Sequence, residues 1–67
     1  MYKYQVNYTK HFLDGILANR TYHDYLRFAD WATADNFKKL CEGGHVFKPF
    51  NGNGNYIADD IILTALD

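Results

Sequence analysis

Apolar and polar residues alternate along the first part of the chain, and the apolar positions are Tyr2, Tyr4, Val6 and Tyr8. A period of two with aromatic and β-branched residues is typical of a strand with one buried face. We expect this strand to continue to Leu13. Asp14-Gly15 then favours a tight two-residue hairpin turn, because both residue types tolerate positive φ. A second strand would begin at Ile16.

The segment from Asn19 to Asp30 fits two structures. As a helix it would start with a capping box formed by Thr21 and Asp24. As a strand it would place three apolar side chains on one face, namely Tyr22, Leu26 and Phe28. We favour the strand, and the helix remains the alternative.

The register of this hairpin tests the strand interpretation. Counting outward from Asp14-Gly15 places Val6 opposite His23, so the apolar residues of the second strand fall on the wrong face. A bulge between Asn19 and Thr21 would correct the mismatch by adding a residue to that strand. In the uncorrected register His11 and His23 point to opposite faces of the sheet.

A helix is predicted from Trp31 to Glu42. Asp30 is a good N-cap residue, and Gly43-Gly44 ends the helix. Between these two ends, apolar residues recur at three- and four-residue spacing and form one stripe, which consists of Trp31, Ala34, Phe37, Leu40 and Cys41.

Two further strands are expected after the helix, at His45–Phe50 and Asn55–Leu66. Pro49 cannot donate a backbone hydrogen bond, which places the first of them at a sheet edge or strand end. The glycine-rich stretch between them, Phe50 to Tyr56, fits neither a phosphate loop, which needs a following helix, nor a calcium loop, which needs acidic ligands. It is interpreted as a hairpin turn.

The predicted fold class is therefore α+β: one domain spanning residues 1–67, with the order ββαββ and one helix packed on a small antiparallel sheet. The expected core consists of Val6, Leu26, Phe28, Phe37, Leu40, Ile61 and Leu63.

Composition narrows the function classes. The chain has 67 residues, twelve of them aromatic (six Tyr, five Phe and one Trp), and a net charge of −1. A general nucleic-acid binder normally carries an excess of basic residues, so this net charge argues against that class. The start of the chain has no hydrophobic signal region, no apolar run is long enough for a membrane span, and Cys41 is the single cysteine. We expect a cytoplasmic protein that does not enter membranes.

Several residues suggest chemistry but favour simpler roles. Cys41 with His11, His23 and His45 has the residue types of a zinc site or a Cys-His catalytic pair. The ligand spacing is wrong for zinc, and Cys41 lies on the apolar stripe, where a thiol packs as a small hydrophobe. Asp59 and Asp60 are interpreted as a strand-edge feature that discourages aggregation. We expect no enzyme activity, no metal and no cofactor.

The tyrosines along the first strand have three possible roles: core beneath the helix, a platform for stacking bases, or a protein interface. One helix covers few of twelve aromatic residues, so we expect some of them to contact another chain, and we expect a homodimer. The candidate partner-binding residues are Tyr2, Tyr4, Tyr8, Tyr22, Tyr25, Arg27, Asp59 and Asp60.

The chain resembles small stand-alone proteins of phages and mobile elements. The features that carry this resemblance are Met1, the Asp14-Gly15 hairpin and the aromatic-rich surface. Such proteins include anti-CRISPR and other anti-defence inhibitors. The resemblance covers the whole chain and transfers no individual residue. It implies inhibition of a host complex, in defence or nucleic-acid processing, by surface binding. The expected function is a non-enzymatic protein-binding module. The alternative is a small single-stranded nucleic-acid-binding protein that uses an aromatic sheet face.

Overall fold

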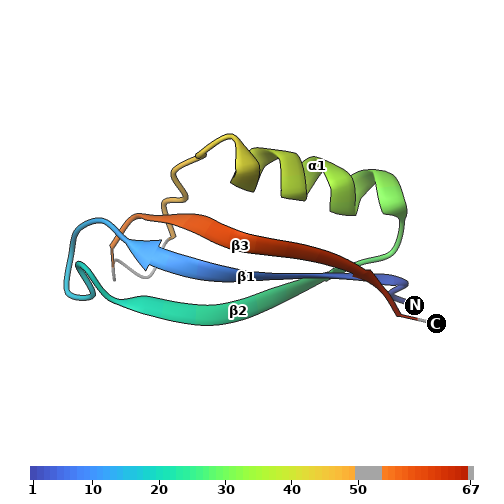
Figure 1. Cartoon of the computed structure of the whole chain (residues 1–67), viewed down its shortest axis with the longest axis horizontal. Coiled ribbons are helices and arrows are strands. Elements are labelled where there is room, and N and C mark those ends of the chain that lie inside the picture. Colours follow the sequence, from blue (N-terminus) through green and yellow to red (C-terminus); the bar gives the residue numbers. More distant parts are fainter. Residues whose placement is uncertain (50–53, 67) are drawn as a thin grey trace.

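The computed structural model describes residues 1–49 and 54–66. Its elements follow the order β1 (Tyr4–Phe12), β2 (Thr21–Phe28), α1 (Trp31–Glu42) and β3 (Tyr56–Ala65). The strands form an antiparallel sheet with the spatial order β2-β1-β3, and α1 lies across one face (Figure 1). The small α+β class is confirmed. Residues Tyr22–Phe28 form a strand, as favoured over the alternative helix, and α1 has the predicted bounds.

The predicted ββαββ order is wrong, because three strands rather than four are found in residues 1–49 and 54–66. Among the described residues of the expected strand after the helix, 45–49, only Phe47 pairs, through two backbone hydrogen bonds with Tyr56 at 2.8 and 3.0 Å. Pro49 follows two residues later and has no N–H to continue the ladder. Four residues of the predicted glycine-rich turn, Phe50 to Asn53, lie outside the described part of the chain.

The β1–β2 connection is longer than the predicted two-residue turn. The loop spans residues 13–20, and Val6 consequently pairs with Leu26 rather than His23. At the end of the loop the Asn19 N–H donates to the Phe12 carbonyl at 2.9 Å, while the Phe12 N–H donates to the Arg20 carbonyl at 3.0 Å. Asn19 has a φ of 66°. Two residues thus oppose Phe12 where the loop joins β2, close to the predicted bulge, but the longer loop rather than a bulge within the strand sets the register.

Both ends of α1 are capped by the residues that the sequence indicates. An Asp30 carboxylate oxygen accepts hydrogen bonds from the N–H and hydroxyl of Thr33, each at 2.8 Å. These bonds hold the pKa of Asp30 below its usual value. At the other end Gly44 adopts a φ of 78°, and the His45 N–H donates to the Leu40 carbonyl at 3.1 Å. This pattern is a Schellman motif.

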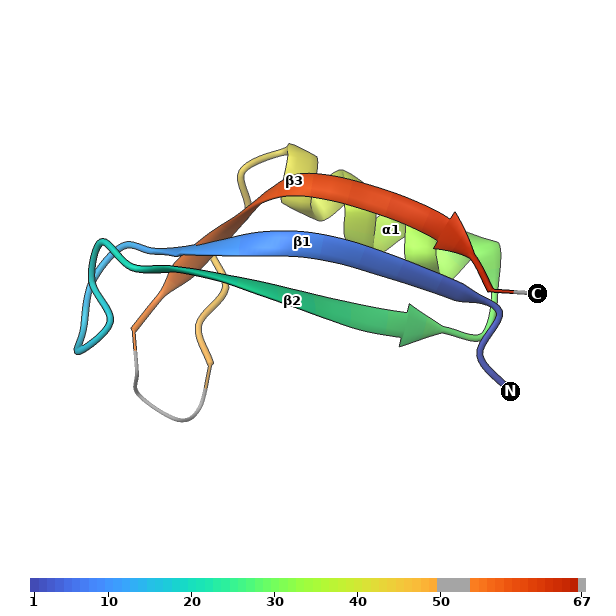
Figure 2. The same cartoon turned by 60° about the horizontal axis from the view of Figure 1, so that its bottom comes forward.

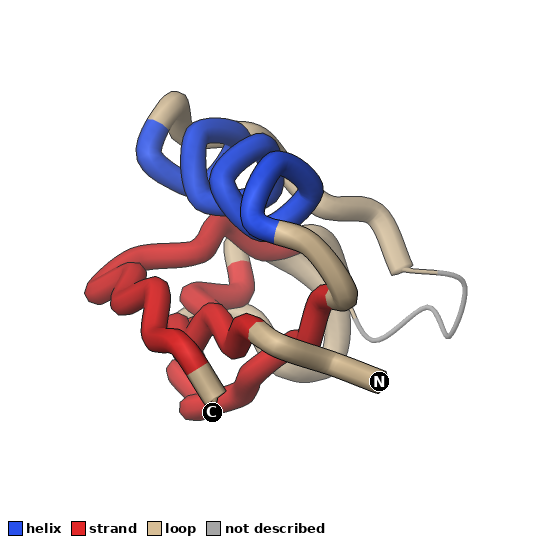
Figure 3. Tube along the Cα trace, turned by 90° about the vertical axis from the view of Figure 1, so that its right-hand side faces the viewer, coloured by secondary structure: helices blue, strands red, loops and turns tan. Residues whose placement is uncertain are grey.

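The core lies between α1 and the neighbouring strands β1 and β3 (Figure 3). Val6 is fully buried, and Phe37 packs edge-on against Tyr8 with ring centroids 5.4 Å apart. The predicted core was wrong for Leu26 and Leu40, which are 43% and 49% exposed. Leu26 is exposed because α1 lies away from β2. Leu40 is exposed because it lies outside the stripe of α1 that contains the buried residues Ala34 and Cys41. The other predicted core residues, Phe28, Ile61 and Leu63, are partly buried against the core.

β3 contains a second bulge. The register of its pairing with β1 shifts between Asn7 and Thr9, and Asp60 has a φ of 52°. The bulge keeps Ile61 and Leu63 on the helix side while Asp59 lies on the other face. Among the described residues, no helix is long and apolar enough to cross a membrane.

Candidate functional site

The face of the sheet opposite α1 is the candidate site, and we call it the open face. Strand register assigns to it four residues from each strand: Gln5, Asn7, Thr9 and His11; Thr21, His23, Tyr25 and Arg27; Ile57, Asp59, Ile62 and Thr64. Figure 2 shows this side, with α1 behind the sheet. Within residues 1–49 and 54–66, no helix or strand covers it.

The tyrosines predicted to bind a partner are divided between the two faces. Tyr8 is 5% exposed and Tyr4 is half-buried, both on the helix side, so the core interpretation is correct for these two residues. Burial and the nearby charge of Asp24 raise the pKa of the Tyr8 phenol. Tyr22 lies on the helix side of β2 with its ring against Phe12, and Tyr2 is exposed before β1.

Tyr25 and Arg27 belong to a connected group of side-chain contacts on the open face. The Arg27 guanidinium carbon lies 5.4 Å from the centroid of the Tyr25 ring. Arg27 Nε donates to Gln5 Oε1 at 2.9 Å, and Gln5 Nε2 donates to Asn7 Oδ1 at 2.9 Å. These contacts hold the Arg27 side chain in place while the Tyr25 ring stays 50% exposed. The pair is a preorganised aromatic and cationic surface.

The row of residues across the middle of the open face is amphipathic. Asn7 pairs with Tyr25 on one side and with Ile62 on the other. Ile62 is 61% exposed. Adjacent strands lie about 4.8 Å apart, so the two apolar side chains flank the Asn7 amide roughly 10 Å from each other. Such a row offers apolar area on both sides of a hydrogen-bonding group.

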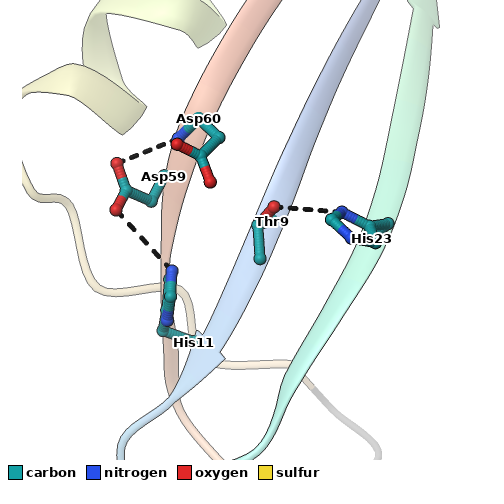
Figure 4. Close-up of polar contacts among 5 residues, drawn as sticks. All are labelled: Thr9, His11, His23, Asp59 and Asp60. Carbon is teal, nitrogen blue, oxygen red and sulfur yellow. Dashed lines mark hydrogen bonds and ion pairs between the residues drawn. The ribbon is translucent and has the colours of Figure 1, made fainter.

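Two histidines and Asp59 lie at the other end of the open face (Figure 4). Thr9 Oγ1 lies 3.1 Å from His23 Nδ1. His11 Nε2 lies 3.7 Å from Asp59 Oδ2, which is too long for a hydrogen bond, and the buried Nε2 atom has no other partner. The prediction that His11 and His23 point to opposite faces was wrong, because the register differs from the predicted one by an odd number of residues.

The polar residues at this end are not arranged as a metal site. In the part of the chain that the structure describes, no three His, Cys, Asp or Glu side chains are placed to bind one ion. Cys41 lies on the buried side of α1, and burial raises the pKa of its thiol. A protonated, buried thiol is a poor nucleophile. The interpretation of Cys41 as a packing residue is confirmed.

Asp59 and Asp60 lie at the outer edge of β3. The Asp59 carboxylate accepts a hydrogen bond from the Asp60 N–H at 2.9 Å, and the bulge at Asp60 interrupts the regular edge. Together with Glu42 and Cys41 they line a shallow groove between α1 and β3. Carboxylates and a bulge both discourage pairing with another strand, as the sequence indicated.

Three of the predicted partner-binding residues, Tyr25, Arg27 and Asp59, therefore lie on the open face, and their neighbours there were not predicted. Gln5, Asn7 and Thr9 were visible as the polar half of the alternating pattern of β1. Their strand partners depend on register, which the longer loop changed. No protein-family model, curated protein or solved structure matches this chain.

Proposed function

We propose that this protein is a non-enzymatic protein-binding module whose binding surface is the open face. The observation that supports this most is the row in which the exposed Tyr25 and Ile62 flank the partly buried Asn7, beside the hydrogen-bonded Arg27 side chain. Tyr and Arg are the residue types that most often dominate binding energy at protein interfaces. Ordering before binding reduces the entropy that binding would otherwise cost.

Charge favours a protein over a nucleic acid as the partner. On the open face the positive charge of Arg27, beside Gln5, is balanced by the carboxylate of Asp59, which lies beside Thr9 toward the other end. Tyr4 and Tyr8, which could have stacked bases, lie beneath the helix instead. A surface that binds single strands combines exposed aromatic rings with a basic groove. The open face has one exposed aromatic side chain, Tyr25, and balanced charge.

The resemblance to small phage inhibitors extends the proposal to the biological role. Binding through an exposed face would occlude a host complex of defence or nucleic-acid processing, and occlusion needs no catalytic group. The face of a small rigid sheet suits this role, since its backbone is fixed by two strand ladders.

The test compares variants of the open face with a variant of the helix side. The wild-type protein is used to isolate its partner from host extract, and the purified partner is then titrated by calorimetry. Tyr25→Ala and Ile62→Ser should each weaken binding about 30-fold or more, as expected for central interface residues. Trp31→Ala, which removes an exposed side chain at the start of α1, should leave affinity unchanged.

Two results would contradict the proposal. One is full binding by the Tyr25→Ala, Ile62→Ser double variant. The other is tight binding of single-stranded DNA or RNA that falls steeply with salt and is lost on Tyr25→Ala, since counterion release is the mark of phosphate binding. That second result would support the nucleic-acid alternative.

A further inference from the structure

The two outer edges of the sheet differ in their capacity to accept another strand. β3 is interrupted by the bulge at Asp60, where the Asp59 carboxylate already occupies the Asp60 N–H. β2 is regular over eight residues, contains no Pro or bulge, and is mostly exposed; its carboxylate, Asp24, is neutralised by an ion pair with Lys10. In the described residues, no strand pairs with its outer side. A regular exposed edge is a template for strand addition.

Tyr25 identifies the backbone groups that point outward. Its N–H donates to Asp24 Oδ1 at 2.8 Å rather than to β1. Because N–H groups alternate in direction along a strand, those of His23 and Arg27 point the same way. The outer edge of β2 therefore presents one row of donors and acceptors, with Tyr25 near its centre.

We propose that β2 pairs antiparallel with β2 of a second copy of this chain, across a two-fold axis at Tyr25. In this register Tyr25 meets its own symmetry mate, His23 meets Arg27, and Tyr22 meets Phe28. Aromatic cross-strand pairs of this kind stabilise sheets. Moving the two-fold axis by one residue, to Asp24, would still pair the outward backbone groups of the two strands. It would also place the two Asp24 carboxylates opposite each other, so this register is disfavoured.

The occupant is a second copy because the surface next to this edge is self-complementary and left uncovered by α1. Tyr22, Tyr25 and Leu26 are each at least 41% exposed on the two sides of β2. Pairing across the axis places each of them beside a side chain of the second copy, and the three-stranded sheets become one six-stranded sheet. No such arrangement exists at β3, where the bulge breaks the row of hydrogen-bonding groups.

Asp24 controls access to the edge. Its carboxylate accepts the Tyr25 N–H and forms an ion pair with Lys10 Nζ at 2.8 Å. Burial would raise the pKa of Asp24, but these interactions outweigh it and the net shift is downward. The second copy must replace the Asp24 oxygen with a backbone carbonyl. Association therefore exchanges one hydrogen-bond partner of the Tyr25 N–H for another and adds new backbone hydrogen bonds at His23 and Arg27.

The inference goes beyond the proposed function. A two-fold axis perpendicular to the sheet places both open faces on the same side and brings the two Tyr25–Arg27 pairs next to each other. The dimer would thus present a doubled surface. A monomeric protein could still bind a partner with a single open face, so the two proposals fail independently.

Sedimentation velocity over a range of concentrations tests the pairing. The wild type should be in a monomer–dimer equilibrium. Tyr25→Pro removes the outward N–H without removing a bond to β1, and should raise the dimer dissociation constant about 10-fold or more. Tyr25→Ala is the matched comparison: it removes the same ring but keeps the N–H, so it should weaken the dimer clearly less than Tyr25→Pro does. A wild type that stays monomeric at millimolar concentration, or a Tyr25→Pro variant that dimerises like the wild type, overturns the proposal.

Amide hydrogen exchange of the wild type gives a second test that does not depend on the folding of a variant. Raising the protein concentration should slow exchange at His23, Tyr25 and Arg27. The Asp60 N–H on the opposite edge should be unaffected. Unchanged exchange along β2, or slowing confined to β3, contradicts pairing at this edge.

Discussion

At the scale of single residues, Gly54 determines how closely two loops approach at one end of the sheet. A Cβ atom at this position would overlap the carbonyl oxygen of Asp14, and the φ of 130° is one that other residues rarely adopt. Beside it the Asp14 carboxylate accepts the Asn55 N–H at 2.8 Å and the Asn55 side-chain amide at 3.1 Å. The loop after β1 is thereby fastened to the start of β3.

Gly54→Ala should lower the free energy of unfolding by at least about 3 kcal/mol, from backbone strain and overlap together. Gly44→Ala is the matched control, since Gly44 also has a positive φ but no atom lies within 4 Å of the added Cβ. It should cost about 1 kcal/mol. Urea unfolding monitored by circular dichroism measures both. Equal losses would show that the contact with Asp14 does not matter.

At the scale of elements, the position of α1 divides the helix side of the sheet into a covered and an uncovered part. Val6 on β1 and Leu26 on β2 are directly paired and share this side. Val6 is fully buried, whereas Leu26 is 43% exposed. The helix contacts β3 more extensively than it contacts β2. Position relative to α1, rather than residue type, decides which side chains form the core.

Val6→Ala should therefore destabilise the protein by about 2 kcal/mol, through lost burial and an unfilled cavity. Leu26→Ala removes a larger side chain but should cost less than about 1 kcal/mol, because that side chain keeps much of its contact with water. Chemical denaturation at low protein concentration, where the monomer dominates, is the measurement. A larger loss for Leu26→Ala would mean that another element covers β2.

Local patterns predicted the elements better than their pairing. The caps at Asp30 and Gly43-Gly44 lie within the helix sequence itself, so α1 was placed correctly. The alternation from Tyr4 onward likewise indicated β1. Asp14-Gly15 instead begins a longer loop, since the Asp14 carboxylate bonds to Asn55, 41 positions away. No local pattern contains that contact.

The open face was predicted only in part for the same reason. A change of register by an odd number of residues moves every side chain of a strand to the other face. Tyr25 and Arg27 were named as exposed candidates, but the histidines were assigned to opposite faces. Tyr8 was named as both core and interface, and the position of α1 decides for the core.

At the scale of the whole molecule, two buried acidic groups set how the protein responds to alkaline pH. Burial raises the pKa of Cys41 above its ordinary value of 9.0 and that of Tyr8 above 10.0. The folded state keeps both groups protonated at pH values where the unfolded chain releases the protons. Their contribution to stability is complete below pH 9 and falls as pH rises through the alkaline range.

The free energy of unfolding should thus decrease above pH 9, first through Cys41 and then through Tyr8. Urea titrations between pH 7 and 11 test this. In Cys41→Ala the first part of the decrease should disappear, while the decrease above pH 10 should remain. A wild-type stability that is constant up to pH 11 would contradict the burial of both groups.

The strand order has a consequence for how the chain folds. β1, the first strand in sequence, lies in the middle of the sheet, and its second neighbour β3 is the last. The ladder between them joins Tyr4 to Ala65, and the Leu66 N–H donates to the Lys3 carbonyl at 2.8 Å. Closing such a large loop costs entropy before any contact repays it. We therefore expect the hairpin and the helix to form before β3 joins the sheet. A fragment that stops before Tyr56 leaves one edge of β1 unpaired and should fold less cooperatively than a chain that includes the ten-residue strand β3.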